Sequence, residues 1–79
     1  MKKNGKGKGV GITLKRLRLE KAKISQETLA YRLGKTQSEV SRLEKRKGIS
    51  LETLFKLSKA LEIEPGDFID ALVEDGVYQ

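Results

Sequence analysis

Apolar residues recur at every third or fourth position through most of the chain, the spacing at which side chains share one face of a helix. Polar and glycine-containing breaks divide this pattern into five segments, and no segment alternates with the period of a strand. The pattern predicts helices at about residues 14–23, 26–33, 37–46, 51–61 and 65–73. It therefore indicates an all-α fold of five short helices.

Residues suited to begin a helix stand at the start of each segment. Thr36 and Glu39 have the T-x-x-E form of a capping box, in which the two residues satisfy each other's free backbone N–H groups. Gly34 and Gly48 lie where the second and third helices should end. The other predicted starts are the N-caps Thr13, Ser25 and Ser50 and the first-turn proline Pro65.

The apolar faces of these helices supply the predicted core. In the first helix this face holds Leu14, Leu17 and Ala22, with Leu19 as a further candidate. The two phenylalanines, Phe55 and Phe68, are both expected to be core residues. With these two assigned to the core, recognition of RNA bases by aromatic stacking is disfavoured, because the chain has only two Phe, two Tyr and no Trp.

The second and third helices carry a more specific pattern. A small residue, Ala30, suits a close helix crossing, and Gly34 suits a sharp helix end with positive φ. Val40 is placed to fill the angle between the two helices. Leu29, Leu33 and Leu43 complete the apolar contact. Together these spacings predict a helix-turn-helix motif rather than an ordinary helical hairpin.

Charge and composition then narrow the function. The chain carries 17 Lys and Arg against 11 Asp and Glu, for a net charge of +6. Residues 1–47 hold 15 of these basic residues and only 4 acids, whereas residues 48–79 hold two lysines and seven acids. Such asymmetry indicates that the first part faces a polyanion. On charge alone DNA, RNA and an acidic membrane surface all stay open.

The first eleven residues contain four Lys and four Gly and lack a helical pattern. We expect residues 1–11 to form a flexible basic arm and residues 12–79 to form a single domain.

Other classes of function lack the residues they need. The chain has no Cys and no His, so we expect no metal, no cofactor and no enzyme activity. No apolar run approaches the roughly 20 residues that span a bilayer, so we expect a cytoplasmic protein without a membrane segment.

The third helix has a polar face opposite its core residues. If Val40 and Leu43 point inward, the rotation of about 100° per residue places Ser38, Ser41, Arg42 and Lys45 outward, with Gln37 at the first turn. Gln and Arg can pair bidentately with adenine and guanine, and Lys reaches backbone phosphates. Lys35, just before the helix, is a further candidate DNA contact. Together with Arg46 and Lys47 it adds positive charge around the same face, which favours nucleic-acid binding over a merely soluble surface.

These residues resemble the helix-turn-helix repressors related to phage Cro and repressor proteins, the Xre family, which includes restriction controller proteins and some antitoxins. The resemblance covers residues 14–68, through SQETLAYRLGKTQSEVSRLEKRKG and SLETLFKLSKALEIEPGDF. It implies a five-helix lambda-repressor-like domain. It further implies that Gln26 contacts a phosphate and that four residues approach the operator: Thr36, Gln37, Ser38 and Arg42.

One departure from the family concerns a buried pair. The family usually pairs an arginine of the first helix with the residue matching Glu44, but the interval from Arg18 to Ser25 is one residue longer here. Either Arg18 keeps the pair and the turn around Lys23 absorbs the extra residue, or the pair is lost.

The resulting hypothesis is a transcription regulator, a repressor, that binds double-stranded DNA at an inverted repeat as a homodimer. The alternative is an antitoxin or similar module that binds a toxin and its own promoter. In the last helix, Ile69 and Val73, together with Val77, are predicted to form the dimer contact, and Phe68 to lie in the core.

The roles of the two tyrosines stay open. Tyr31 packs beside the motif, faces solvent or stacks on a base. Tyr78 lies in a tail that is either disordered or part of the dimer.

Overall fold

The computed structural model describes residues 9–77 and confirms the all-α fold, with five α-helices and no strand within that range. The helices are α1 (Val10–Leu17), α2 (Gln26–Leu33), α3 (Gln37–Leu43), α4 (Leu51–Leu61) and α5 (Pro65–Glu74), and a π-helical turn, η1 (Arg18–Ala22), continues α1. Predictions for residues 1–8 and for Tyr78 lie outside the described residues.

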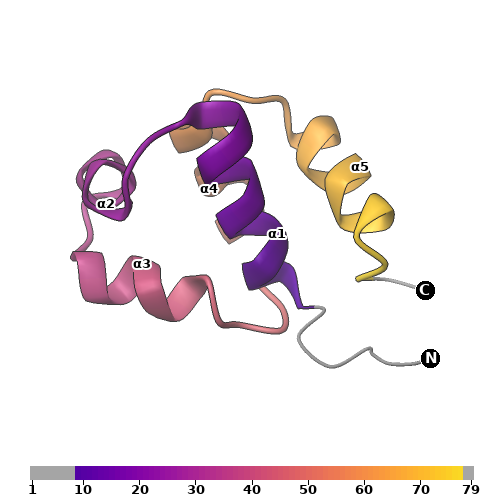
Figure 1. The fold of residues 1–79 in the computed structure, drawn as a ribbon, viewed down its shortest axis with the longest axis horizontal. Coiled ribbons are helices and arrows are strands. Elements are labelled where there is room, and N and C mark those ends of the chain that lie inside the picture. The colour runs from indigo at the N-terminus through magenta and orange to yellow at the C-terminus, as the bar shows by residue number, and fades with distance from the viewer. Residues whose placement is uncertain (1–8, 78–79) are drawn as a thin grey trace.

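The helices surround one core. Figure 1 shows α1 at the centre, α2 and α3 on one side of it, and α5 on the other, with α4 behind. Helix α5 packs against both α4 and α1, and α2 packs against α3 and α4. The fully buried large side chains come from every α-helix: Val10, Leu14, Leu17, Leu29, Val40, Leu57, Leu61, Phe68 and Leu72.

Most of the predicted helix starts are confirmed, since caps depend on residues close in sequence. Ser25 and Ser50 accept hydrogen bonds from the backbone N–H groups of Thr28 and Thr53, at 3.0 and 3.1 Å. Pro65 occupies the first turn of α5. The prediction for Thr13 is wrong: the first helix already begins at Val10, and Thr13 lies buried inside it, where its hydroxyl donates to Asp75 Oδ2 at 2.7 Å.

The start of α1 lies against the chain just after α3, so residues 10 and 11 belong to the domain rather than to an arm. The free backbone N–H groups of Val10 and Gly11 donate to the carbonyl oxygens of Lys47 and Arg46, at 3.2 and 2.9 Å. A Cβ on Gly11 would lie 2.4 Å from the carbonyl carbon of Glu44, which leaves room only for glycine. This glycine therefore serves close packing rather than flexibility.

Arg18 keeps its buried pair with Glu44, and the π-helical turn explains how. A π turn holds one residue more than an α turn, and here it is followed by Lys23 in the left-handed region at φ 56°. Both features absorb the extra residue of this interval. Arg18 is consequently able to turn inward and pair with Glu44.

Three further expectations need correction. Leu19, a candidate core residue, and Phe55, predicted to be a core residue, are each about half exposed, because no neighbouring helix covers them. Helix α3 ends at Leu43 rather than near Arg46. The residues after it form hydrogen bonds that span three residues instead of four, from Lys45 N–H to Arg42 O and from Arg46 N–H to Leu43 O.

Candidate nucleic-acid interface

The turn between α2 and α3 has the geometry that the motif requires. Gly34 adopts φ 68°, a conformation that costs glycine little, and the next N–H, of Lys35, donates to Ala30 O at 2.9 Å. Ala30 and Val40 are buried where the two helices meet. The helix-turn-helix predicted from these three positions is confirmed.

A complete capping box sets the start of α3. The Thr36 hydroxyl accepts from Glu39 N–H at 3.2 Å, and Glu39 Oε1 accepts from Thr36 N–H at 2.9 Å. The Thr36 hydroxyl also donates to Glu39 Oε1, at 3.2 Å. The two hydrogen bonds that the carboxylate accepts, first the one from the Thr36 backbone and then the one from its hydroxyl, hold the pKa of Glu39 below its ordinary value. The capping box therefore fixes the first turn of α3, which holds Gln37 and Ser38.

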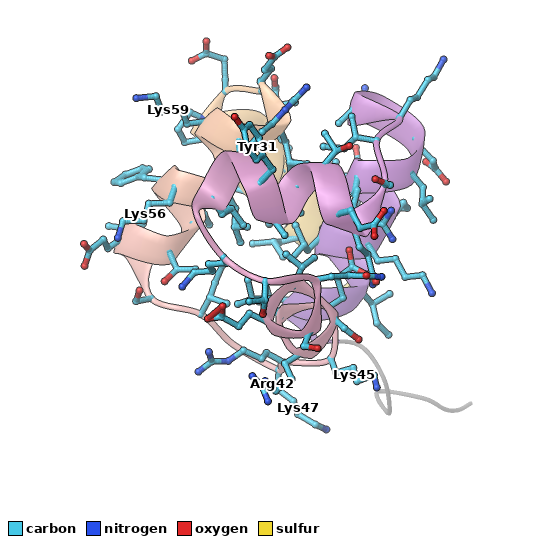
Figure 2. The ribbon with its side chains drawn as sticks, turned by 90° about the vertical axis from the view of Figure 1, so that its left-hand side faces the viewer. Tyr31, Arg42, Lys45, Lys47, Lys56 and Lys59 are labelled. Atoms are coloured by element: carbon cyan, nitrogen blue, oxygen red, sulfur yellow. The ribbon has the colours of Figure 1, made fainter. Side chains whose placement is uncertain are left out.

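The predicted DNA-contacting side chains of α3, and Lys45 just after it, lie on the outer side of the motif. Gln37, Ser38, Arg42 and Lys45 are exposed, and Ser41 is half-buried. Figure 2 shows Arg42 and Lys45 extending from one edge of the molecule, together with Lys47. The cationic and polar groups of this edge therefore face solvent without a covering helix.

A hollow of about 430 Å³ lies along one flank of α3. It is lined by Lys35 from the turn before the helix and by Arg42 and Lys45, all three predicted site residues, and by Arg46, which was predicted only as surrounding charge. One acid, Glu39, lies among them, and its carboxylate is engaged in the capping box. The positive charge predicted around the helix is thus concentrated beside it.

On the other flank, a chain of hydrogen bonds leads from the core to the tip of α3. Arg18 Nε donates to Glu44 Oε2 at 2.5 Å, and both side chains are buried. Gln26 Nε2 donates to Glu44 Oε1 at 2.8 Å, and Gln37 Nε2 donates to Gln26 Oε1 at 3.3 Å. Two predicted site residues, Gln26 and Gln37, are thereby brought together.

Sequence reasoning missed this connection. It considered Arg18 and Glu44 only as a structural pair and Gln26 only as a phosphate contact. The signal was present in part, because Gln26 opens α2 and Gln37 opens α3, and a helix-turn-helix brings these two ends near each other. Nothing local, however, places Glu44 beside Gln26.

The aromatic and basic residues outside α3 are arranged differently. Tyr31 is 87% exposed, so it faces solvent, and Figure 2 shows it on the far side of α2 from Arg42. Lys56 and Lys59 also lie away from the α3 edge, on α4. These three residues are separate from the candidate interface.

The predicted dimer residues divide into two kinds. Ile69 and Val73 are both exposed on α5, whereas Val77 is half-buried and packs against the core. Phe68 is fully buried, as predicted. Leu51 and Phe55, on α4, are additional exposed apolar residues that sequence reasoning did not assign to a surface.

The fold and this edge define a helix-turn-helix DNA-binding domain. The family model described as Helix-turn-helix matches residues 14–68, and the chain belongs to this family, of the Xre type. Among curated proteins, the chain is similar to "Control protein C.BamHI" of Bacillus amyloliquefaciens. The two are 34% identical over 61 residues, which cover 76% of this chain and 75% of that protein. No solved structure matches the chain significantly. Within residues 9–77, no helix is both long and apolar enough to traverse a lipid bilayer.

Proposed function

We propose that this protein is a sequence-specific transcription regulator that binds an inverted-repeat operator as a homodimer, with α3 in the major groove. The observation that carries the proposal is the exposed row of Gln37, Ser38 and Arg42 on a helix whose first turn is locked by a capping box. Base edges in the major groove are read by such side chains. The proposed activity is binding, without a catalytic step.

The flanking cations and Arg42 have different roles in the proposed recognition of DNA. Lys35, Lys45 and Arg46 line the flank of α3, where the DNA backbone passes on either side of an inserted helix. They supply affinity that does not depend on sequence, and Arg42 supplies preference for one base pair. Ser41 and Thr36 lie at the margins of the same face, and Gln26 is retained as a proposed phosphate contact.

The basic arm fits the same proposal. Gly9, the first described residue, lies against the backbone of Arg46 and Lys47, just after α3, and four lysines precede it in the sequence. We expect deletion of residues 2–8 to lower affinity for any duplex and to flatten the dependence of affinity on salt, because fewer phosphates are neutralised. An unchanged salt slope would show that these lysines do not bind DNA.

A dimer places two copies of α3 on one operator. Ile69 and Val73 are four residues apart and form an exposed apolar stripe on α5. Leu51 and Phe55 form a similar stripe on α4, against which α5 packs. The opposite flank of α5 faces α1 and carries the acids Asp67, Asp70 and Glu74, so the apolar flank is the one suited to a second copy.

Sedimentation tests the dimer. We expect the wild type to be a dimer at micromolar concentration and the double variant Ile69→Asp, Val73→Asp to be a monomer. The matched control, Asp67→Asn with Asp70→Asn, changes two exposed residues on the other flank and should leave the dimer intact. A monomeric wild type, or a dimeric Ile69→Asp, Val73→Asp variant, would contradict this assignment.

Selection of bound duplexes from a random pool tests the regulator itself. The expected product is an inverted repeat with half-sites about 10 bp apart, or a multiple of that turn. A reporter gene placed behind that repeat should then fall in expression when the protein is supplied. A rise would make the protein an activator, and a pool without any enriched sequence would refute the proposal. The similarity to a control protein favours this proposal over the antitoxin alternative.

A further inference from the structure

The first turn of α1 is packed closely against the chain that leaves α3. Val10 N–H donates to Lys47 O at 3.2 Å, and Gly11 N–H donates to Arg46 O at 2.9 Å. A Cβ on Gly9 would lie 2.7 Å from Lys47 Cα and 2.8 Å from Arg46 O, so a larger residue there would push the two segments apart. Both carbonyl groups are therefore held toward α1 by close backbone contact.

The direction of these two carbonyl groups fixes the direction of two N–H groups. In a trans peptide the C=O of one residue and the N–H of the next point to opposite sides of the chain, and no peptide bond within residues 9–77 is cis. Because Arg46 O faces α1, Lys47 N–H faces away from it, and because Lys47 O faces α1, Gly48 N–H does the same. Neither N–H donates to a backbone carbonyl within the described residues. Two successive donors thus point outward.

These donors lie on the side of the molecule that carries the candidate interface. Figure 1 shows the chain after α3 passing below the start of α1, so the direction away from α1 is toward the lower edge of that view. Figure 2 shows Lys47 at the same edge as Arg42 and Lys45. Both Lys47 and Gly48 are exposed, and Lys45, Arg46 and Lys47 are consecutive cations directly before Gly48. Backbone N–H groups in such a place are ligands for phosphate oxygens.

We infer that the first turn of α1 positions a phosphate contact: Val10 and Gly11 hold the two carbonyl groups, and the N–H groups of Lys47 and Gly48 thereby form a fixed pair of donors for one phosphate of the DNA backbone. The inference rests on the proposed function, since it assumes that the α3 edge meets DNA. It adds a neutral main-chain contact to the cationic side chains already assigned to the backbone. Val10 and Gly11 touch no DNA themselves and act as positioning residues.

A neutral N–H donor differs from a lysine in one measurable respect. A cationic side chain that binds phosphate releases counterions, so its removal flattens the dependence of affinity on salt. A backbone N–H carries no net charge, so its removal should lower affinity by the same factor at every salt concentration. Base preference should also stay the same, because a phosphate contact does not depend on sequence.

The variants Gly48→Pro and Gly48→Ala test the donor itself. Proline removes the N–H, whereas alanine keeps it. Gly48 has no positive φ, and a Cβ there would meet open space, so the position accepts a side chain. We expect Gly48→Pro to bind the selected operator and a random duplex roughly tenfold more weakly than Gly48→Ala, as for the loss of a hydrogen bond to a charged group. Their salt slopes should be equal, whereas Lys47→Ala should show a flatter slope.

A second pair of variants tests the positioning role of α1. Val10 is the first residue of α1, where proline is tolerated, and Gly9 before it has the extended conformation that suits a following proline, with φ −101° and ψ 173°. Val10→Pro removes the N–H that holds Lys47 O, and Val10→Ala keeps this N–H while shortening the buried side chain. We expect Val10→Pro to bind both duplexes several-fold more weakly than Val10→Ala, because Gly48 N–H is no longer fixed.

The double variant Val10→Pro, Gly48→Pro should bind no more weakly than Gly48→Pro, because both changes act on the same peptide group. Gly11→Ala is an independent test, since its Cβ would separate α1 from the chain after α3. It should lower affinity for both duplexes without changing the salt slope or the base preference. Circular dichroism and thermal unfolding identify the variants that fold, and Gly11→Ala decides the positioning role if Val10→Pro does not.

The outcomes separate this inference from the proposed function. A wild type that binds no duplex would overturn both. A wild type that binds its operator, with equal affinities for Gly48→Pro and Gly48→Ala, would overturn only the inference. A flatter salt slope in Gly48→Pro would also overturn it, because a cation would then have been displaced. Additive losses in the double variant, or an unchanged affinity in Gly11→Ala, would overturn the positioning role of α1. A loss in Gly48→Pro with an unchanged salt slope, and no further loss on adding Val10→Pro, is the result expected.

Discussion

Arg18 and Arg16 lie two residues apart and join the same helical stretch to opposite halves of the chain. Arg18 is buried and pairs with Glu44, beside the recognition helix. Arg16 is partly exposed and pairs with Asp75 at 3.0 Å and Glu74 at 3.7 Å, at the end of α5. The N-terminal half is therefore organised around an internal polar network, whereas the C-terminal half is joined to α1 by ion pairs near the surface.

The surfaces of the two halves also differ, because the first exposes polar and cationic side chains and the second exposes apolar ones. The α3 edge exposes Gln, Ser, Arg and Lys side chains and leaves its apolar residues inside. Helices α4 and α5 expose the apolar residues Leu51, Phe55, Ile69 and Val73, and residues 48–79 are acidic overall. One surface is suited to a hydrated polyanion and the other to a protein surface. The comparison supports DNA recognition by the first half and self-association by the second.

Replacing the two arginines one at a time should give the largest difference in the free energy of unfolding. Arg18→Ala leaves Glu44 buried without a charged partner, and we expect a loss of about 3–5 kcal/mol in the free energy of unfolding. Arg16→Ala removes only partly exposed pairs and should cost about 1 kcal/mol or less. Urea denaturation measures both values. Equal losses would mean that the buried network has no special place in the fold.

Substitution of two glycines, Gly11 in the N-terminal half and Gly66 in the C-terminal half, compares how closely the backbone is packed in each. Gly11→Ala inserts a Cβ into the backbone of Glu44 and should destabilise the protein by about 1–3 kcal/mol. Gly66→Ala, in the first turn of α5, meets open space and should stabilise it by about 0.5–1 kcal/mol. Melting temperatures of the two variants should therefore move in opposite directions. A neutral Gly11→Ala would show that α1 can move away from the chain after α3.

Two cations test where DNA binds. Arg42→Ala should weaken binding to the selected operator by about 1–3 kcal/mol and relax preference at one base pair. Lys56→Ala, on α4 and away from the α3 edge, should change affinity little. Fluorescence anisotropy with specific and random duplexes measures both. If Arg42→Ala lost equal affinity for the two duplexes, Arg42 would be a phosphate contact rather than a reader of bases.

The smallest effect concerns the capping box and pH. Because hydrogen bonds from Thr36 lower the pKa of folded Glu39 below that of the unfolded chain, they stabilise the fold fully above the unfolded pKa. This contribution is lost as the pH falls through the folded pKa. Glu39→Gln should therefore show a smaller loss of stability than the wild type between neutral and acid pH. Parallel curves for the two proteins would contradict this role.

The parts of the fold that could be predicted are those specified by neighbours in sequence. Ser25, Ser50 and the Thr36–Glu39 box act within three residues, and Gly34 takes the positive φ that its turn demands. These local rules were sufficient to predict the helix-turn-helix and the exposed face of α3. The same reasoning predicted the exposed residues of α5 from their spacing.

The parts that could not be predicted depend on contacts between distant segments. Gly11 looks like part of a flexible arm until the carbonyl groups after α3, more than thirty residues away, are found beside it. Phe55 has the spacing of a core residue, yet no helix covers it. The link from Glu44 through Gln26 to Gln37 requires three separate elements to meet, and no local pattern encodes such a meeting.

The division between the two halves is tested most directly by one titration. Affinity is measured for a full inverted repeat and for a single half-site, each with the preferred or an altered base at the position that Arg42 reads. We expect Arg42→Ala to keep the advantage of the full repeat but to lose the base preference. We expect Ile69→Asp, Val73→Asp to keep the base preference but to bind the repeat no better than the half-site. If the α5 variant lost base preference, or if Arg42→Ala abolished the advantage of the repeat, the two functions would not belong to separate halves.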